Sequence, residues 1–194
     1  MEEDMKHHHC IGREIGEFSV QAYVCGKIKT ITKEDMIGKW SLFFFYPADF
    51  TFVCPTELKD LAEHYEEFNQ EGCEVYSVST DSEFVHKAWA DASETIRSIQ
   101  YPMLADTAWK LSKEFGVLVK EAGQALRAAF IVSPEGKIKA YEVHDMGIGR
   151  NAKELLRVLR AAKFVEEHGD QVCPAKWEPG EETLMPSLDL VGRL

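Results

Sequence analysis

One apolar run followed by an amphipathic segment constrains the fold more than any other feature of this sequence. Residues 41–46 form a continuous apolar run, and Pro47 ends it. Such a run, bounded by polar residues, is typical of a strand that is buried on both faces of a sheet. Residues 55–70 then carry apolar side chains at helical spacing, and Gly72 ends that pattern. The two segments predict a central strand followed by a helix that packs on the sheet.

The remaining segments continue this alternation. Short strands over 18–24 and 27–31 flank a turn at Gly26, and one helical turn is expected over 32–37. Further along, the patterns predict a strand over 73–79 and a helix that is capped at Asp81 and Ser82 and runs to about Ile99. An extended piece over 101–106 and a short helix over 107–115 follow. The last elements are a hairpin of 128–133 and 137–143 around a turn at 134–136, and a helix from Asn151 to about His168. This order predicts a three-layer α/β sandwich around a central mixed β-sheet.

The periodic patterns end after Gly169. A chain of 194 residues suits one domain with an appendage. We expect a flexible N-terminus over 1–11 and a single domain over 12–168. The segment 169–194 contains prolines and Trp177 and cannot form a core alone, so we expect an extended C-terminal arm that packs on its own domain or on another subunit.

Charge and hydropathy exclude several classes of partner. The net charge is −11 and no basic stripe is present, which argues against nucleic acid and anionic membranes. The longest apolar runs are far shorter than the roughly 20 residues of a membrane span, and no secretory signal pattern is visible. We therefore expect a cytoplasmic protein with no nucleic-acid or membrane partner.

The cysteines also restrict the chemistry. They are Cys10, Cys25, Cys54, Cys73 and Cys173. Their odd number and the lack of a C-x-x-C motif argue against a zinc ribbon or a thioredoxin-type dithiol, and they are too sparse for a disulfide-stapled secreted scaffold. We expect Cys73, at the start of a strand, to lie in the core, and Cys25 to lie at a turn or in a partly buried site.

Cys54 stands where the predicted central strand gives way to the helix. The unpaired N–H groups at a helix start and the positive end of its dipole favour a thiolate over a thiol, and the thiolate is the form that attacks. The alternative is a buried structural cysteine. Thr51 before it and Pro55 after it favour the activated thiol, because a core cysteine needs neither.

The pattern Pro47-x-x-x-Thr51-x-x-Cys54 resembles the active-site motif of the peroxiredoxins. The Val-Cys-Pro block at 172–174 and the ending 186–194 resemble the bacterial alkyl hydroperoxide reductase C type of typical 2-Cys peroxiredoxin. The resemblance implies a thioredoxin-like fold. It also implies a thiol-dependent peroxidase, without a cofactor, that reduces hydrogen peroxide and small organic hydroperoxides in antioxidant defence.

The resemblance assigns roles to single residues. Cys54 matches the peroxidatic cysteine, which becomes a sulfenic acid. Cys173 matches the resolving cysteine, which condenses with that sulfenic acid to an intersubunit disulfide. The Thr51 hydroxyl is suited to donate to one peroxide oxygen and accept from the other, and Pro47 shapes the loop and shields the thiolate from water.

Three charged residues complete the implied site. Arg127 matches the family's active-site arginine, whose guanidinium favours the thiolate and polarises the peroxide. Glu57 resembles the carboxylate that orients this arginine, and Arg150 matches a second arginine near the same place. The alternative for Arg127 is a surface arginine at a strand end, and for the other two it is an ordinary charge at a helix end.

The implied cycle needs electrons from a partner. The resemblance suggests a flavoprotein disulfide reductase or a thioredoxin- or glutaredoxin-like protein, and it implies a homodimer, commonly within a ring of five dimers. The aromatic residues Phe44, Phe45, Tyr46, Phe50 and Phe52 offer surface for such contacts, although core packing explains most of them. Two other classes stay open, namely a disulfide oxidoreductase, against which the missing C-x-x-C counts, and a holdase activity of an oligomeric ring.

The run His7-His8-His9-Cys10 brings four potential metal ligands together. Neighbours in sequence do not easily all point at one ion. We read the run as a disordered terminus or a cloning remnant and assign no metal.

Overall fold

Strand β3 (Trp40–Phe45) lies inside the sheet, as the apolar run predicts, and all of its residues are buried. It pairs in parallel with β4 (Cys73–Ser79) and antiparallel with β8 (Arg127–Val132). Its side chains alternate between two cores, with Phe44 on one face of the sheet and Phe43 on the other. The strand therefore joins both halves of the hydrophobic interior.

The structure, a computed structural model, describes residues 9–193. Its main sheet has seven strands in the order β2-β1-β5-β4-β3-β8-β9. The strands not yet described are β2 (Lys27–Thr32), β1 (Ser19–Val24), β5 (Met103–Ala105) and β9 (Ile138–His144), of which β2 and β9 are the edges. Parallel pairing in the middle and hairpins at both ends make this the predicted mixed sheet. A further two-stranded piece, β6 (Leu118–Val119) with β7 (Gln124–Ala125), has no counterpart in the prediction.

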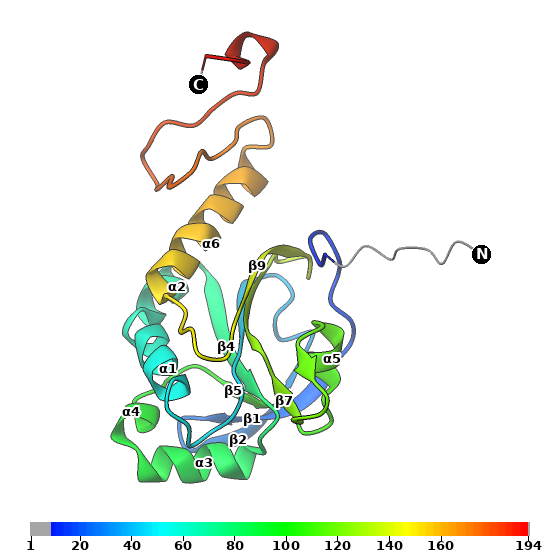
Figure 1. Cartoon of the computed structure of the whole chain (residues 1–194), viewed down its shortest axis with the longest axis vertical. Helices are drawn as coiled ribbons and strands as arrows, with labels where there is room; N and C mark the ends of the chain where they lie inside the picture. Colours follow the sequence, from blue (N-terminus) through cyan, green and yellow to red (C-terminus); the bar gives the residue numbers. More distant parts are fainter. Residues whose placement is uncertain (1–8, 194) are drawn as a thin grey trace, which may run out of the picture.

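Helices cover both faces of this sheet (Figure 1). One face carries α1 (Cys54–Glu63), α2 (Tyr65–Gln70), α3 (Glu83–Ala92), α4 (Glu94–Arg97) and α6 (Ala152–Glu167). The other face carries α5 (Lys110–Glu114) together with residues of the N-terminal segment such as Ile15 and Phe18. The three-layer sandwich is thus confirmed. Across residues 9–193, no helix is long and apolar enough to span a membrane.

Two predicted helices are each broken into two. In the first, the backbone N–H of His64 bonds to Leu61 instead of Asp60, while the His64 ring nitrogen lies 2.9 Å from the Asp60 carbonyl. The side chain thus takes the acceptor that a continuous helix would use. In the second, Ser93 adopts an extended conformation and its hydroxyl caps α4. The apolar periodicity continues across both breaks, which is why the sequence alone predicts single helices.

Two further differences concern short elements. Of residues 32–37, Thr32 ends β2 and the others form hydrogen-bonded turns rather than a helix. The helix predicted over 107–115 begins only at Lys110, because Trp109 has a positive φ of 58° and cannot lie within it. The core, the order of the strands and the layers are unaffected.

The chain after α6 forms an arm that extends away from the sheet and ends in the short 3-10 helix η1 (Leu188–Leu190) (Figure 1). Backbone bonds between Val172 and Leu184 close part of the arm into a loop. Among residues 169–193 of the arm, only Trp177 is deeply buried, at 3% exposure, against α6.

Candidate active site

Cys54 is the first residue of α1, and its side chain has 0% exposure. Pro47 is buried at the end of β3, and the loop between them passes through Phe50, whose φ is +54°. Val53, the N-cap residue, supplies no side-chain hydrogen bond. Pro55 has no N–H, and the N–H groups of Thr56 and Glu57 bond to the Val53 carbonyl. The N–H of Cys54 itself precedes the first bonds of the helix, at the end where the helix dipole favours negative charge.

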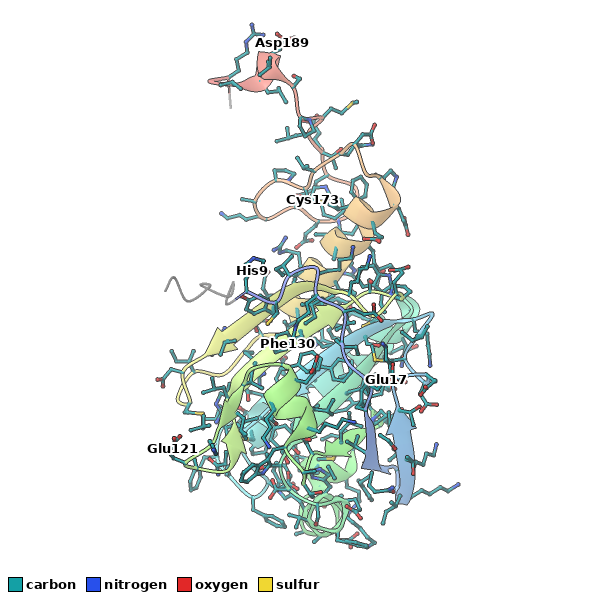
Figure 2. All side chains as sticks on the ribbon, turned by 90° about the vertical axis from the view of Figure 1, so that its right-hand side faces the viewer. His9, Glu17, Glu121, Phe130, Cys173 and Asp189 are labelled. Atoms are coloured by element: carbon teal, nitrogen blue, oxygen red, sulfur yellow. The ribbon has the colours of Figure 1, made fainter. Side chains whose placement is uncertain are left out.

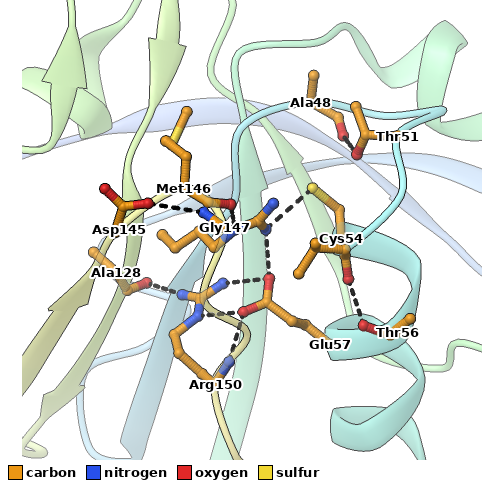
Figure 3. Close-up of polar contacts among 12 residues, drawn as sticks. Ala48, Thr51, Cys54, Thr56, Glu57, Ala128, Asp145, Met146, Gly147 and Arg150 are labelled. Carbon is orange, nitrogen blue, oxygen red and sulfur yellow. Dashed lines mark hydrogen bonds and ion pairs between the residues drawn. The ribbon is translucent and has the colours of Figure 1, made fainter.

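Arg127 supplies the nearest positive charge. It begins β8, and its Nη1 lies 3.3 Å from Cys54 Sγ (Figure 3). Its Nε donates to the carbonyl of Met146 at 2.6 Å. Because Arg127 is buried, the guanidinium is fixed with one N–H group directed at the sulfur.

Glu57 holds both arginines of the site. Its Oε2 accepts from Arg127 Nη1 at 2.7 Å. Arg150 approaches the same carboxylate with its Nε at 2.8 Å, its Nη2 at 3.0 Å and its backbone N–H at 2.9 Å. Since Cys54 and Glu57 are three residues apart on α1, they lie on the same side of its first turn. The helix therefore presents a thiol and a carboxylate to the same guanidinium.

Arg150 has further partners that fix it. Its Nη1 donates to the Ala128 carbonyl at 2.6 Å, and its guanidinium lies 3.4 Å from the centre of the Phe44 ring. Burial lowers the pKa of Arg150 from its ordinary value, and the adjacent Glu57 opposes that change. A central side chain of β3 thus forms one wall of the charged cluster.

The charged side chains in contact around Cys54 carry more positive than negative charge; Glu142, which also acts on Arg150, is only half-buried and outside these contacts. Arg127 and Arg150 carry two positive charges, and Glu57 carries one negative charge, all in buried positions. A buried unpaired charge is unfavourable. A thiolate at Cys54 supplies the missing negative charge, 3.3 Å from the Arg127 Nη1 atom. The arrangement is suited to a nucleophilic thiolate.

The Thr51 hydroxyl differs from the role expected for it. It donates to the Ala48 carbonyl at 2.9 Å, so that its proton is already engaged (Figure 3). Its oxygen keeps acceptor capacity. In this structure the donor that contacts the sulfur is the Nη1 group of Arg127.

A buried polar network that the sequence did not reveal anchors the loop before Cys54. The Tyr46 hydroxyl donates to one carboxylate oxygen of Asp49 at 2.7 Å, and His86 Nδ1 lies 2.7 Å from the other. His86 Nε2 lies 3.2 Å from the Leu104 carbonyl. Burial and the adjacent carboxylate raise the pKa of Tyr46 well above its ordinary value, so the phenol stays a donor. A single histidine on a helix gives no signal of this pairing in sequence.

The other cysteines lie elsewhere. Cys173 is half-buried on the arm beside α6 (Figure 2). It takes part in none of the hydrogen bonds of the cluster around Cys54. Cys73 is in the core and burial raises its pKa, and Cys25 is exposed at the β1–β2 turn with a φ of +47°, as predicted for both.

The histidine run falls largely outside the described residues, since His7 and His8 precede residue 9. Within residues 9–193 no group of three or more His, Cys, Asp or Glu side chains could hold a metal ion.

Family comparisons agree with the motifs. The AhpC/TSA family matches residues 11–141, and the C-terminal domain of 1-Cys peroxiredoxin matches residues 161–194. Alkyl hydroperoxide reductase C of Salmonella typhimurium is 53% identical over 184 residues, which cover 95% of this chain and 98% of that protein. The same protein of Bacillus subtilis is 50% identical, with the same coverage.

Solved structures give the same result for the fold. Enterococcus faecalis AhpC has 60% sequence identity and a TM-score of 0.84, over 86% of this chain and 99% of that chain. The reduced 2-Cys peroxiredoxin of Plasmodium vivax has 31% identity and a TM-score of 0.87, over 93% of this chain and 95% of that chain. The chain therefore belongs to the AhpC/TSA family and, within it, to the peroxiredoxins of the alkyl hydroperoxide reductase C type, which are thiol-dependent peroxidases.

Proposed function

We propose that Cys54 is the peroxidatic cysteine of an antioxidant enzyme that reduces hydrogen peroxide and small organic hydroperoxides. The observation that carries this proposal is the buried sulfur, 3.3 Å from the Arg127 guanidinium at the first residue of α1. The thiolate attacks one peroxide oxygen, so that an S–O bond forms and the O–O bond breaks. The leaving oxygen takes a proton and departs as water or an alcohol, and Cys54 is left as a sulfenic acid.

The surrounding residues stabilise the transition state of this step. Arg127 directs fixed N–H groups at the place where negative charge moves from sulfur to oxygen. Glu57 and Arg150 hold Arg127 in position through the contacts described above. Thr51 accepts a hydrogen bond from the hydroperoxide, and Pro47 helps to exclude water from the loop.

Cys173 acts as the resolving cysteine of a second copy of the chain. Its place on the arm, outside the cluster around Cys54, supports a partner in another subunit (Figure 2). Its thiol condenses with the Cys54 sulfenic acid, which forms a disulfide and releases water. In this proposal the peroxide-binding site belongs to the domain over 12–168 and the resolving thiol to the arm over 169–194. Residues 1–11 have no catalytic role.

The assembly that fits this cycle is a homodimer within a ring of five dimers. Phe44, Phe45 and Tyr46 are core residues, but Phe50 is 56% and Phe52 is 92% exposed, which supports further subunit contacts beside the active-site loop.

The Cys54–Cys173 disulfide is then reduced by a flavoprotein disulfide reductase or a thioredoxin- or glutaredoxin-like protein. We propose a cytoplasmic location, and the net charge of −11 argues against nucleic-acid and anionic-membrane partners.

Two cysteine variants test this proposal. Cys54→Ser should abolish peroxide consumption, while Cys173→Ser should keep one rapid oxidation of Cys54 and lose turnover with dithiol reductants. After one equivalent of peroxide, the unaltered chain should migrate as a disulfide-linked dimer on a non-reducing gel, and both cysteines should be needed. Full peroxidase activity in the Cys54 variant would refute the assignment.

A further inference from the structure

A small cavity opens beside the hairpin of β1 and β2, which forms one edge of the sheet. Its volume is about 240 Å³, just below the roughly 300–1,000 Å³ of drug-sized ligand sites, which suits a small ligand. Its charged and phenolic lining residues are Lys29, Lys39, Asp35, Glu74, Tyr65 and Tyr76. Strand β8, which carries Arg127, lies next to the other edge, so the cavity is separate from the peroxidase site.

The Tyr76 hydroxyl indicates that this cavity takes a polar ligand. Tyr76 is only 3% exposed, and its hydroxyl takes part in no hydrogen bond across residues 9–193. Burial raises the pKa of Tyr76, and the neighbouring groups that act on it include Glu74, Asp35 and Tyr65, which all line the cavity. The hydroxyl therefore faces the cavity as an unused donor. Because a buried polar group without a partner is unfavourable, a ligand that accepts from it is favoured.

Two lysines supply positive charge to the cavity. Lys29 and Lys39 are both exposed, and neither forms an ion pair within the described part of the chain. The chain as a whole has a net charge of −11, so two unpaired lysines at one cavity are a local concentration of the opposite sign. Their ammonium groups are suited to the carboxylates of a ligand.

Two carboxylates lie in the same cavity. Glu74 Oε1 accepts from the Tyr65 hydroxyl at 2.7 Å, and Asp35 Oδ2 accepts from the N–H of Thr32 at 2.8 Å. The other oxygens, Glu74 Oε2 and Asp35 Oδ1, take part in no hydrogen bond among residues 9–193. These oxygens attract an ammonium group and repel a phosphate-rich polyanion. The cavity therefore fits a small zwitterion that carries carboxylates and an ammonium group.

Cys25 places a thiol beside this cavity. It directly follows Val24, and its Sγ lies 3.6 Å from the Gln100 carbonyl, and both of these neighbours line the cavity. The residue is exposed at the turn between β1 and β2. An accessible thiol exchanges with a disulfide through its thiolate. A ligand of the cavity that is itself a disulfide would therefore meet the Cys25 sulfur.

We propose that Cys25 and this cavity form a site for S-thiolation by a low-molecular-weight thiol that carries two carboxylates and one ammonium group. The Cys25 thiolate attacks one sulfur of the symmetric disulfide of that thiol. A new S–S bond joins half of the ligand to Cys25, the ligand's own S–S bond breaks, and the other half leaves as a thiolate with the electron pair. Cys25 is oxidised and the departing half is reduced, so the step needs no peroxide and does not depend on the proposed role of Cys54.

The cavity binds the half of the ligand that becomes attached. Lys29 and Lys39 pair with its carboxylates, and the free oxygen of Glu74 pairs with its ammonium group. The Tyr76 hydroxyl donates to one of the carboxylates. These residues select the ligand, and Cys25 alone reacts.

The main test measures how fast Cys25 of the reduced full-length chain reacts with glutathione disulfide, whose halves each carry these groups. Hydroxyethyl disulfide, which is uncharged, is the reference reagent. Samples are stopped by acid and digested without reduction, and mass spectrometry measures the mixed disulfide at each cysteine. We expect the ratio of the two rates at Cys25 to exceed that at the half-buried Cys10 by roughly tenfold, as two exposed charge pairs together provide.

Three variants separate the cavity from a general attraction by positive charge. Lys29→Gln combined with Lys39→Gln should remove most of the preference for glutathione disulfide. Tyr76→Phe keeps the ring and should slow the reaction with glutathione disulfide by roughly threefold, through the loss of one hydrogen bond. Lys27→Gln is the matched control, because Lys27 is exposed on the same strand, two residues after Cys25, and is not among the lining residues.

Each outcome decides. An unchanged rate with hydroxyethyl disulfide shows that the turn and the Cys25 thiol are intact in a variant. Equal rate ratios at Cys25 and Cys10, or no mixed disulfide at Cys25, would overturn the site. A loss in Lys27→Gln as large as in the double lysine variant would also overturn it, since the cavity would then select nothing.

Discussion

The surroundings of Cys54 and of Cys173 are built in opposite ways. Cys54 is fully buried among side chains from three elements, and every charged partner there has several fixed contacts. Cys173 is half-buried on an arm that is docked through one ring and a few hydrogen bonds. Regions with few buried contacts open at low free energy, and densely packed regions do not. The thiol of Cys54, which must be activated, thus lies in the rigid region. The thiol of Cys173, which must reach another site to form the disulfide, lies in the loosely held one.

Cys73 shows that burial alone does not activate a thiol. It is buried like Cys54, but no guanidinium contacts it, and burial raises its pKa far above the ordinary value. What distinguishes Cys54 is the arginine pair around Glu57. Changes to that cluster should therefore have the largest effects.

The largest effect is expected for Glu57→Gln. This change leaves two buried guanidinium groups without their shared carboxylate and should lower the free energy of unfolding by about 3–5 kcal/mol. Urea denaturation measures it. Glu63→Gln on the same helix is the control, because its pair with Lys59 is exposed at 3.6 Å and its loss should cost no more than about 1 kcal/mol. Equal losses for the two variants would contradict the buried network.

Arg127→Lys should have the next largest effect. A lysine ammonium cannot contact Cys54, Glu57 and the Met146 carbonyl together, since it lacks the planar fork of a guanidinium. We expect the rate constant for Cys54 oxidation by hydrogen peroxide to fall by about 10²- to 10³-fold, as for loss of one transition-state donor. Stopped-flow measurement checks this, with the exposed Arg13→Lys as control. A rate within a factor of about three of the original would show that charge alone is sufficient.

The same contrast explains how much of the molecule could be predicted from its sequence. The buried central strand and the Cys54 helix start follow from local patterns, so β3 and the place of the thiol are where the sequence predicts them. Glu57, Arg127 and Arg150 were identified through the family resemblance, because residues so far apart in the chain carry no local sign of meeting.

Contacts between distant elements account for part of what the sequence does not reveal, and local bonds between side chains and the backbone account for the rest. The pairing of His86 with Asp49 depends on α3 lying against the active-site loop. The breaks at His64 and Ser93 arise from side-chain bonds to the backbone that leave the apolar period unchanged. The docking of Trp177 depends on the face of α6 that the sheet leaves free.

Tyr46→Phe tests whether the loop before Cys54 belongs to the rigid region. The change removes the donor to Asp49 and leaves one buried carboxylate oxygen without it, which should lower the free energy of unfolding by about 1–3 kcal/mol. If the loop needs this anchor, the rate constant for peroxide should also fall. Tyr65→Phe is the matched control, because the Tyr65 hydroxyl donates to Glu74 at 2.7 Å away from the loop, so that stability should fall without a change in rate. If the rate constant fell in both variants, or in neither, the bond between Tyr46 and Asp49 would have no specific effect on the reactivity of Cys54.

The smallest effect is expected at the arm, as a dependence of its docking on pH. Burial raises the pKa of Cys173 in the docked arm above that of the free thiol. A thiol with a raised pKa favours docking fully below the ordinary thiol pKa, about 8.5. That contribution is lost as the pH rises through the docked pKa, because the thiolate is then better accommodated by the undocked arm. Arg157 limits the change, since its charge opposes the rise.

Trypsin cleavage after Lys176, next to the buried Trp177, reports the undocking of the arm from α6. Between pH 7.5 and 9.5, cleavage of the reduced chain should increase relative to Cys173→Ser, whose hydroxyl does not titrate, by less than about tenfold, the ratio given by one pKa unit. Taking the ratio of the two proteins at each pH removes the pH dependence of the protease itself. A constant ratio would mean that the docking of the arm does not depend on the protonation of Cys173. If this cleavage ratio instead fell as the pH rises, the docked arm would stabilise the thiolate of Cys173 better than water does. The effect of Arg157 on the pKa of Cys173 would then be larger than that of burial.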